Sequence, residues 1–185
     1  MFLVEIPTIS AAHSRIDASI AALANPRDRI MLEVYRDHWL AEVHNDIAAI
    51  MATLPDGPVS YRFQGNGLMI RDPLEFGTAQ EARALYQGAA DSGLPMAGPF
   101  AEERWAFADW GMMFEGVNIA ITRGASLFGL SDPLDPEALY LVHYRSMSLH
   151  PIDVERRLML GEHVYTGSVV SLDRVDASAI TQMLA

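Results

Sequence analysis

Residues 139–172 read LYLVHYRSMSLHPIDVERRLMLGEHVYTGSVVSL, and this stretch decides the fold class. Apolar and polar side chains alternate from Leu139 to Leu149, and a second strand-like run extends from Arg157 to Leu172. Such alternation is typical of β-strands, because successive side chains point to opposite faces. Pro151 and residues 152–155 separate the two runs, which predicts an antiparallel hairpin.

Further strands are predicted upstream of this hairpin. Residues 101–115 and 117–123 alternate in the same way, and Gly124, Pro133 and Pro136 follow them. An earlier strand, residues 59–64, ends at Gly65-Asn66-Gly67, which is typical of a hairpin turn.

Helical signals occupy the first half of the chain. Asn25-Pro26 predicts a helix start, with an N-cap followed by proline at the first helical position. Apolar and aromatic residues then recur at helical spacing as far as Leu54, where the turn sequence of residues 55–58 ends the pattern. Thr78 and Glu81 form a capping box that predicts another helix. Asp176 is expected to cap a short last helix.

Helices that precede a run of long strands predict an α+β fold with a curved antiparallel sheet. At 185 residues the chain is long enough for one domain with a substantial core. We expect that domain to span residues 25–185. Residues 1–24 contain a weak amphipathic helix and are expected to form an arm that packs on the body or on a second subunit.

Composition restricts the possible partners. The chain has 13 basic and 24 acidic residues, a net charge of −11, so that nucleic acid and anionic membrane surfaces are not expected partners. It has no cysteine, which excludes disulfides and thiolate chemistry. The N-terminus lacks the pattern of a signal peptide, and no apolar run is long enough to cross a bilayer. We therefore expect a cytoplasmic protein.

The order of elements resembles the nuclear transport factor 2-like superfamily, which includes ketosteroid isomerase, scytalone dehydratase and the SnoaL-like polyketide cyclases. The residues that carry the likeness are Tyr35-Arg36-Asp37-His38-Trp39 with His44-Asn45-Asp46, Thr78-Ala79-Gln80-Glu81-Ala82, and Gly161-Glu162-His163-Val164-Tyr165. The resemblance spans about residues 27–172. It implies a cystatin-like cone, in which the curved sheet wraps around the N-terminal helices and encloses a pocket.

The resemblance implies a SnoaL-like cyclase, isomerase or dehydratase that acts on a hydrophobic carbonyl compound by acid–base catalysis without a cofactor. The alternative is a non-catalytic module that binds a small molecule or serves in assembly, such as the small subunit of a ring-hydroxylating dioxygenase. The resemblance also favours a homodimer. Several enzymes of this group have a histidine or aspartate just after the first strand. Here Tyr61 lies on that strand, and we take it as a substrate-binding candidate.

Candidate site residues lie on the Pro26 helix. If this helix continues past His44, Asp46 joins the apolar face, where loss of solvent would suit it to proton transfer. Alternatively the helix breaks and Asp46 caps the next turn. Tyr35 and His38 lie at one edge of the apolar stripe and Trp39 lies within it. The resemblance suggests that Tyr35 donates to an oxyanion; the alternative is a core tyrosine with its hydroxyl at the rim.

The predicted hairpin carries a second group of candidates. On one strand face, His143 is expected near Tyr165 and Arg145 near His163. His143 would serve as a base, while Arg145 would hold a carboxylate or enolate oxygen. Alternatively this face is the outer surface of the sheet.

The sequence contains no motif typical of a metal or nucleotide site. No His-x-Glu or His-x-x-x-His pair occurs, so that no metal is expected. Neither a Gly-x-Gly-x-x-Gly motif nor a Gly-x-Ser-x-Gly elbow is present.

Overall fold

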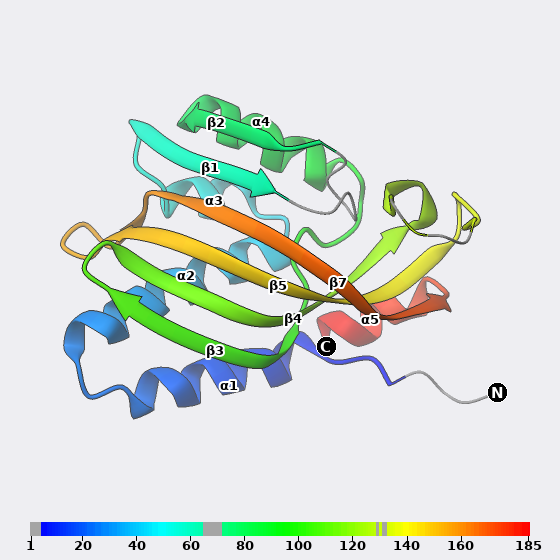
Figure 1. Ribbon diagram of the computed structural model, residues 1–185, viewed down its shortest axis with the longest axis horizontal. Coiled ribbons are helices and arrows are strands. Elements are labelled where there is room, and N and C mark those ends of the chain that lie inside the picture. The colour runs from blue at the N-terminus through cyan, green and yellow to red at the C-terminus, as the bar shows by residue number, and fades with distance from the viewer. Residues whose placement is uncertain (1–4, 65–71, 129, 131–132) are drawn as a thin grey trace.

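The computed structural model describes residues 5–64, 72–128, 130 and 133–185. The protein is an α+β cone, in which one open, curved mixed sheet lies against the N-terminal helices (Figure 1). The helices are α1 (Ile9–Ala22), α2 (Pro26–Val43), α3 (Ile47–Ala52), α4 (Ala79–Ala90) and α5 (Ser178–Leu184). The strands are β1 (Pro58–Gln64), β2 (Leu74–Thr78), β3 (Phe100–Ala108), β4 (Gly111–Arg123), β5 (Leu139–Asp153), β6 (Leu158–Met159) and β7 (Gly161–Val175).

The sheet has the strand order β2-β1-β7-β5-β4-β3, and the short β6 pairs with the end of β5. The predicted antiparallel hairpin is confirmed, because β5 pairs with β7 along most of its length. The pairing register differs from the expected one, because the turn lies further along the chain than expected. Tyr165 lies opposite Met147 and His163 lies opposite Leu149, because β5 extends to Asp153 and the chain turns beyond it.

One strand pair departs from the expected antiparallel pattern. β1 runs parallel to β7, with Ser60 opposite Gly161, whereas the other pairs among the described strands are antiparallel. About a hundred residues separate Ser60 from Gly161, so that no short turn constrains their relative direction. The alternation of apolar and polar residues within each strand therefore could not predict that β1 pairs in parallel with β7.

The predicted long first-half helix is broken near its C-terminal end. Asn25 caps α2 as expected, and the helix continues to Val43. Asn45 then adopts a left-handed conformation with φ of 53°, and Asp46 caps α3 through its side chain, which accepts from the backbone N–H of Ala49 at 2.9 Å. The capping alternative for Asp46 is therefore confirmed.

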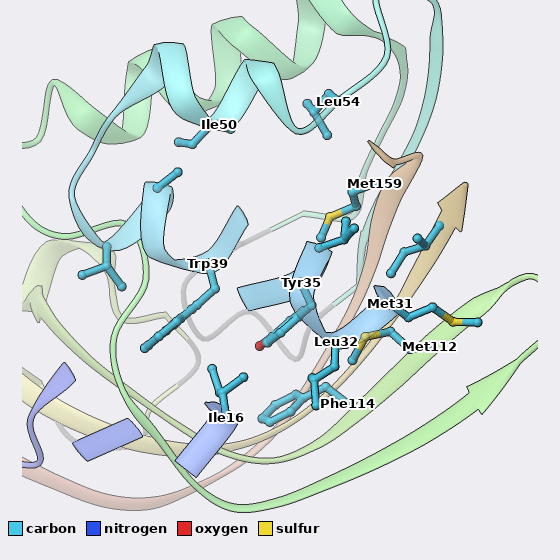
Figure 2. Packing of buried hydrophobic residues seen from close by; sticks show 14 of the residues in the cluster. Ile16, Met31, Leu32, Tyr35, Trp39, Ile50, Leu54, Met112, Phe114 and Met159 are labelled. Carbon is cyan, nitrogen blue, oxygen red and sulfur yellow. The ribbon is translucent and has the colours of Figure 1, made fainter. Parts of the chain in front are cut away.

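Helix α1 packs on the main core, which is one of the two placements expected for the N-terminal segment. Ile9, Ala12, Ile16 and Ile20 are buried at intervals of three or four residues, which places them on one helical face. They join the cluster that includes Leu32, Tyr35 and Trp39 of α2 (Figure 2). The figure shows these α2 side chains on the side of the helix that faces Phe114 of β4.

The remaining expectations differ from the structure mainly at their boundaries. The capping box of Thr78 and Glu81 is present at the start of α4. The run 101–115 is interrupted at Asp109-Trp110, where a tight turn joins β3 to β4. Strand β2 was not predicted, and the predicted turn at Gly65-Asn66-Gly67 lies outside the described residues. Among the helices described, none has the length and apolar character needed to span a membrane.

Candidate functional site

A cavity of about 550 Å³ lies between α2, α4 and the sheet. Helix α2 contributes Tyr35, His38, Trp39 and Glu42 to its wall. The spacings i, i+3, i+4 and i+7 place these four side chains on one face of the helix. Asn25 and Pro26 fix the first turn of α2, and burial of Leu32 and Trp39 fixes its rotation against the sheet.

Strand β5 supplies a polar row to the same cavity. Tyr144, Ser146, Ser148 and His150 all line it, and they alternate with residues on the opposite face of the strand. Glu162 is the cavity-facing residue of the neighbouring β7 strand at the level of His150. A row of hydroxyl, imidazole and carboxyl groups therefore faces the polar edge of α2.

Two carboxyl groups and two imidazoles gather at one end of the cavity. His38 Nε2 lies 3.4 Å from Glu42 Oε1, and His150 Nδ1 lies 3.9 Å from Glu162 Oε1. The side chains of Glu42 and Glu162 are each 17% exposed. Burial, followed by the charge of Glu42, raises the pKa of Glu162 well above its ordinary value. Glu162 therefore retains its proton at higher pH than an ordinary glutamate.

A directed chain of hydrogen bonds fixes the tautomer of His38. The Thr53 hydroxyl donates to the carbonyl oxygen of Ile50 at 2.6 Å, so that Thr53 Oγ1 accepts from His38 Nδ1, also at 2.6 Å. His38 Nε2 then faces Tyr86 Oη at 3.0 Å, and Tyr86 Oη contacts Tyr61 Oη at 3.0 Å. Nε2 is therefore the nitrogen of His38 that could exchange a proton with a molecule bound in the cavity.

Burial keeps the tyrosine hydroxyls of the site protonated. The pKa of Tyr35 is raised well above its ordinary value by burial and then by the negative charge of Glu162. Burial, followed by the charge of Glu42, likewise raises the pKa of Tyr86, and burial raises the pKa of Tyr144 to about 12. These hydroxyls remain hydrogen-bond donors at neutral pH.

His150 is held neutral in this environment. Burial, followed by the positive charges of His38 and His163, lowers the pKa of His150 to about 3. Its Nε2 contacts Ser148 Oγ at 2.7 Å, and its ring packs edge-on against Tyr35 with 4.8 Å between ring centroids. Protonation of this imidazole in the folded state would bury an added positive charge.

The lowered pKa of His150 makes a prediction about acid stability. Because the folded pKa lies below the unfolded value of 6.5, the neutral imidazole favours folding above pH 6.5, and this contribution decreases as pH falls towards 3. Each pH unit in this window costs about 1.4 kcal/mol. We expect His150→Gln, relative to the wild type, to gain about 2.3 kcal/mol of unfolding free energy between pH 6.5 and 4.5, measured by urea denaturation.

The control for this experiment is His44→Gln, because His44 is exposed at the end of α2. It should keep the acid sensitivity of the wild type. Equal acid sensitivity in His150→Gln and the wild type would contradict the assignment of a buried, neutral His150.

Comparisons with known proteins show a similarity of fold. No protein-family model and no curated protein matches the chain. A candidate SnoaL-like polyketide cyclase from Shewanella putrefaciens CN-32 is similar in structure, with a TM-score of 0.56, 10% identity and coverage of 99% of this chain and 97% of the other. A candidate polyketide cyclase from Xanthomonas campestris pv. campestris has a TM-score of 0.50, 12% identity, and coverage of 75% and 91%, respectively.

The chain shares the fold of these two candidate polyketide cyclases. At these identities the likeness concerns the fold alone, so that the site must be judged by its own geometry. Within this fold, the predicted residues Tyr35, His38 and Trp39 do line the cavity. The Trp39 ring also donates to the carbonyl oxygen of Gly98 at 3.0 Å, which ties α2 to the chain segment before β3.

Two candidates on the helical side lie elsewhere. Asp46 is exposed and its carboxylate caps α3, so that the predicted burial of Asp46 on the apolar face is wrong. Tyr61 is fully buried beside Tyr86 and is stacked on Phe76 at 4.8 Å between ring centroids. Its hydroxyl contacts that of Tyr86, and Tyr61 is not among the residues that line the cavity.

The second group of candidates lies on the outer face of the sheet. Arg145 is exposed and forms an ion pair with Glu102 at 2.6 Å, and Tyr165 is 37% exposed. His143 Nδ1 contacts Ser171 Oγ at 2.8 Å, and His163 Nε2 contacts Ser60 Oγ at 2.9 Å. The pocket interpretation of this face is therefore corrected to the alternative, an outer surface, because the cavity and helix α2 lie on the other side of β5.

Sequence reasoning missed the central residues of the site, Glu42, Glu162, His150 and Ser146. One usable signal existed for Glu42, which follows Tyr35 by seven positions and His38 by four on the same helical stripe. No such signal distinguished the two faces of β5, because apolar residues occupy both. Among the residues described, no three or more histidine, aspartate or glutamate side chains are arranged so that they could hold a metal ion.

Proposed function

We propose that the protein is a cofactor-independent acid–base enzyme that acts on a hydrophobic carbonyl compound as an isomerase, cyclase or dehydratase. The observation that carries this proposal is Glu162, a carboxyl group with a raised pKa in a largely apolar cavity, beside His150 and facing Glu42. A carboxylate of raised pKa is a stronger base than an ordinary glutamate. The SnoaL-like fold supports the same class, since the two similar structures are candidate polyketide cyclases.

The proposed reaction begins with transfer of a proton from a carbon beside the substrate carbonyl to ionised Glu162. The negative charge that develops on the carbonyl oxygen is stabilised by hydrogen bonds, for which the Tyr35 hydroxyl is the proposed donor. The proton then returns to another position, or leaves with a hydroxyl group as water. Proton removal and return need only acid and base groups, which Glu162, Glu42 and His38 supply.

The experiment that tests this proposal does not require the natural substrate. We expect the protein to catalyse exchange of hydrogen for deuterium beside the carbonyl group in at least one member of a panel of apolar ketones incubated in D2O. Mass spectrometry measures the incorporation. Ketones that bind without any catalysed exchange would instead favour the alternative of a non-catalytic binding module.

We also propose that the chain forms a homodimer through the outer face of the sheet. This face carries Met147 and Tyr165 at its centre, with the ion pairs Arg145–Glu102 and Arg104–Glu115 beside them. An apolar centre beside groups of both charges can pair with a second copy of itself about a two-fold axis.

For this dimer we expect a mass in solution of twice the chain mass of 20.4 kDa, measured by light scattering during size-exclusion chromatography. Met147→Glu should produce a monomer, because it places a charge at the centre of the interface. A wild-type protein that is monomeric at micromolar concentration would contradict the proposal.

A further inference from the structure

The polar row on β5 contains one hydroxyl group that has no partner. Tyr144 is hydrogen-bonded to the Asn118 side chain, and Ser148 contacts His150 at 2.7 Å. Between them, Ser146 is 4% exposed, its Oγ is buried, and no hydrogen-bond partner for it exists among the described residues. Ser146 also lines the cavity, so that a bound molecule can lie against this side chain.

An unpaired hydroxyl of this kind is unfavourable in the empty protein. A buried polar group without a hydrogen bond costs about 1–3 kcal/mol, and the great majority of such groups have a partner. Alanine would fill the position without this cost. A ligand oxygen that reaches Ser146 would satisfy the hydroxyl.

The neighbouring strand adds a second hydroxyl at the same level. Thr166 of β7 lies directly opposite Ser146, and it also lines the cavity. Side chains that face each other across an antiparallel pair have Cβ atoms about 5 Å apart. One ligand oxygen is therefore within reach of both hydroxyl groups.

This hydroxyl pair is well separated from the acid–base groups. Ser146 precedes His150 by four residues on β5, and Thr166 follows Glu162 by four residues on β7. At about 3.3 Å per residue, the separation along each strand is about 13 Å. Phe100, Phe114 and Val164 also line the cavity and provide apolar surface.

We propose that Ser146 and Thr166 form a distal subsite that binds a hydroxyl or carbonyl oxygen of the substrate. The substrate is then an elongated apolar molecule with oxygen at both ends, one end at Glu162 and the other at Ser146. This inference deepens the proposed function and rests on it. Ser146 is a specificity-determining residue in this assignment and takes no part in proton transfer.

The test uses two probes that differ by one distal hydroxyl, 4-phenylcyclohexanone and 4-(4-hydroxyphenyl)cyclohexanone. Titrations followed by NMR measure the dissociation constants. We expect the wild type to bind the hydroxylated probe about tenfold more tightly, which corresponds to one additional hydrogen bond. Ser146→Ala should lose most of this preference, with Thr166 as the one remaining hydroxyl of the subsite. It should melt at the same temperature as the wild type or higher, because it removes an unsatisfied group.

The matched control is Ser171→Ala, which removes a hydroxyl from the outer face of β7 and should keep the preference for the hydroxylated probe. Equal binding of the two probes by the wild type, or an unchanged preference in Ser146→Ala, would overturn the distal subsite and leave the proposed function intact. If neither probe binds the wild type, the inference and the proposed function on which it rests are both overturned.

Discussion

Glu162→Gln is expected to reduce catalysed deuterium exchange by about 10²- to 10⁴-fold, the usual contribution of a positioned acid or base. Glutamine keeps the shape of the side chain and the contacts of β7, but its amide cannot accept the substrate proton. The measurement is the exchange rate of an active ketone in D2O. Glu75→Gln is the matched control, because Glu75 is an exposed carboxylate on β2 whose ion pair with Arg62, at 2.9 Å, lies on the surface.

The same substitution should stabilise the protein at alkaline pH. Because the folded pKa of Glu162 is raised above the ordinary value of 4.5, its protonated form favours folding below pH 4.5, and this contribution is lost as pH rises through the folded pKa. A glutamine side chain does not ionise and would carry no such loss. We therefore expect the advantage of Glu162→Gln to grow by about 1.4 kcal/mol per pH unit above 4.5 until Glu162 is ionised.

Glu162→Gln is thus expected to lower the exchange activity and to raise the unfolding free energy. Together these two changes distinguish a functional carboxyl group from a structural one. Lost exchange with increased stability would show that the carboxyl is retained at a cost to folding. Full exchange activity in Glu162→Gln would remove Glu162 as the base. A stability difference that stays constant from about pH 5 to about pH 8 would contradict the raised pKa.

Gly161→Ala is expected to destabilise the protein by at least about 3 kcal/mol. Gly161 has φ of +141°, a conformation that L-residues rarely adopt. A Cβ atom at this position would overlap the backbone of Ser60, because β1 lies directly alongside. The parallel pair β1–β7 would have to separate, and Glu162 would be displaced with it.

Urea denaturation of Gly161→Ala measures this effect, and Gly88→Ala is the control. Gly88 lies within α4, and an added Cβ there meets no atom within 4 Å. Alanine at this position should stabilise the helix by about 0.5–1 kcal/mol. A Gly161→Ala variant as stable as the wild type would contradict the close approach of β1 to β7.

Local patterns in the sequence predicted the elements that depend on local physics. Asn25 caps α2, Thr78 and Glu81 form a capping box, and the run from Leu139 onwards is a strand of the sheet. Each of these signals involves residues within a few positions of one another. The break after Val43 was left open, because Asp46 suits both a helix interior facing a pocket and an N-cap.

The site was predicted only where it lies on a helix. Tyr35, His38 and Trp39 were found because helical spacing links them to the core stripe that includes Leu32. The strand residues were assigned to the wrong face. His143 and Arg145 share one face of β5, as expected, but α5 and solvent lie on that side, whereas the cavity lies on the side of His150.

The sequence by itself determined the fold class, most of the elements and the helical half of the site, because hydrophobic periodicity and capping act between near neighbours in the chain. Only the tertiary structure decided which face of β5 encloses the cavity, since alternation separates two faces without naming the inner one. It also decided that Glu162 lies near Glu42 and His150. That meeting depends on the register of β7 against β5 and on the packing of α2, which joins residues far apart in the sequence.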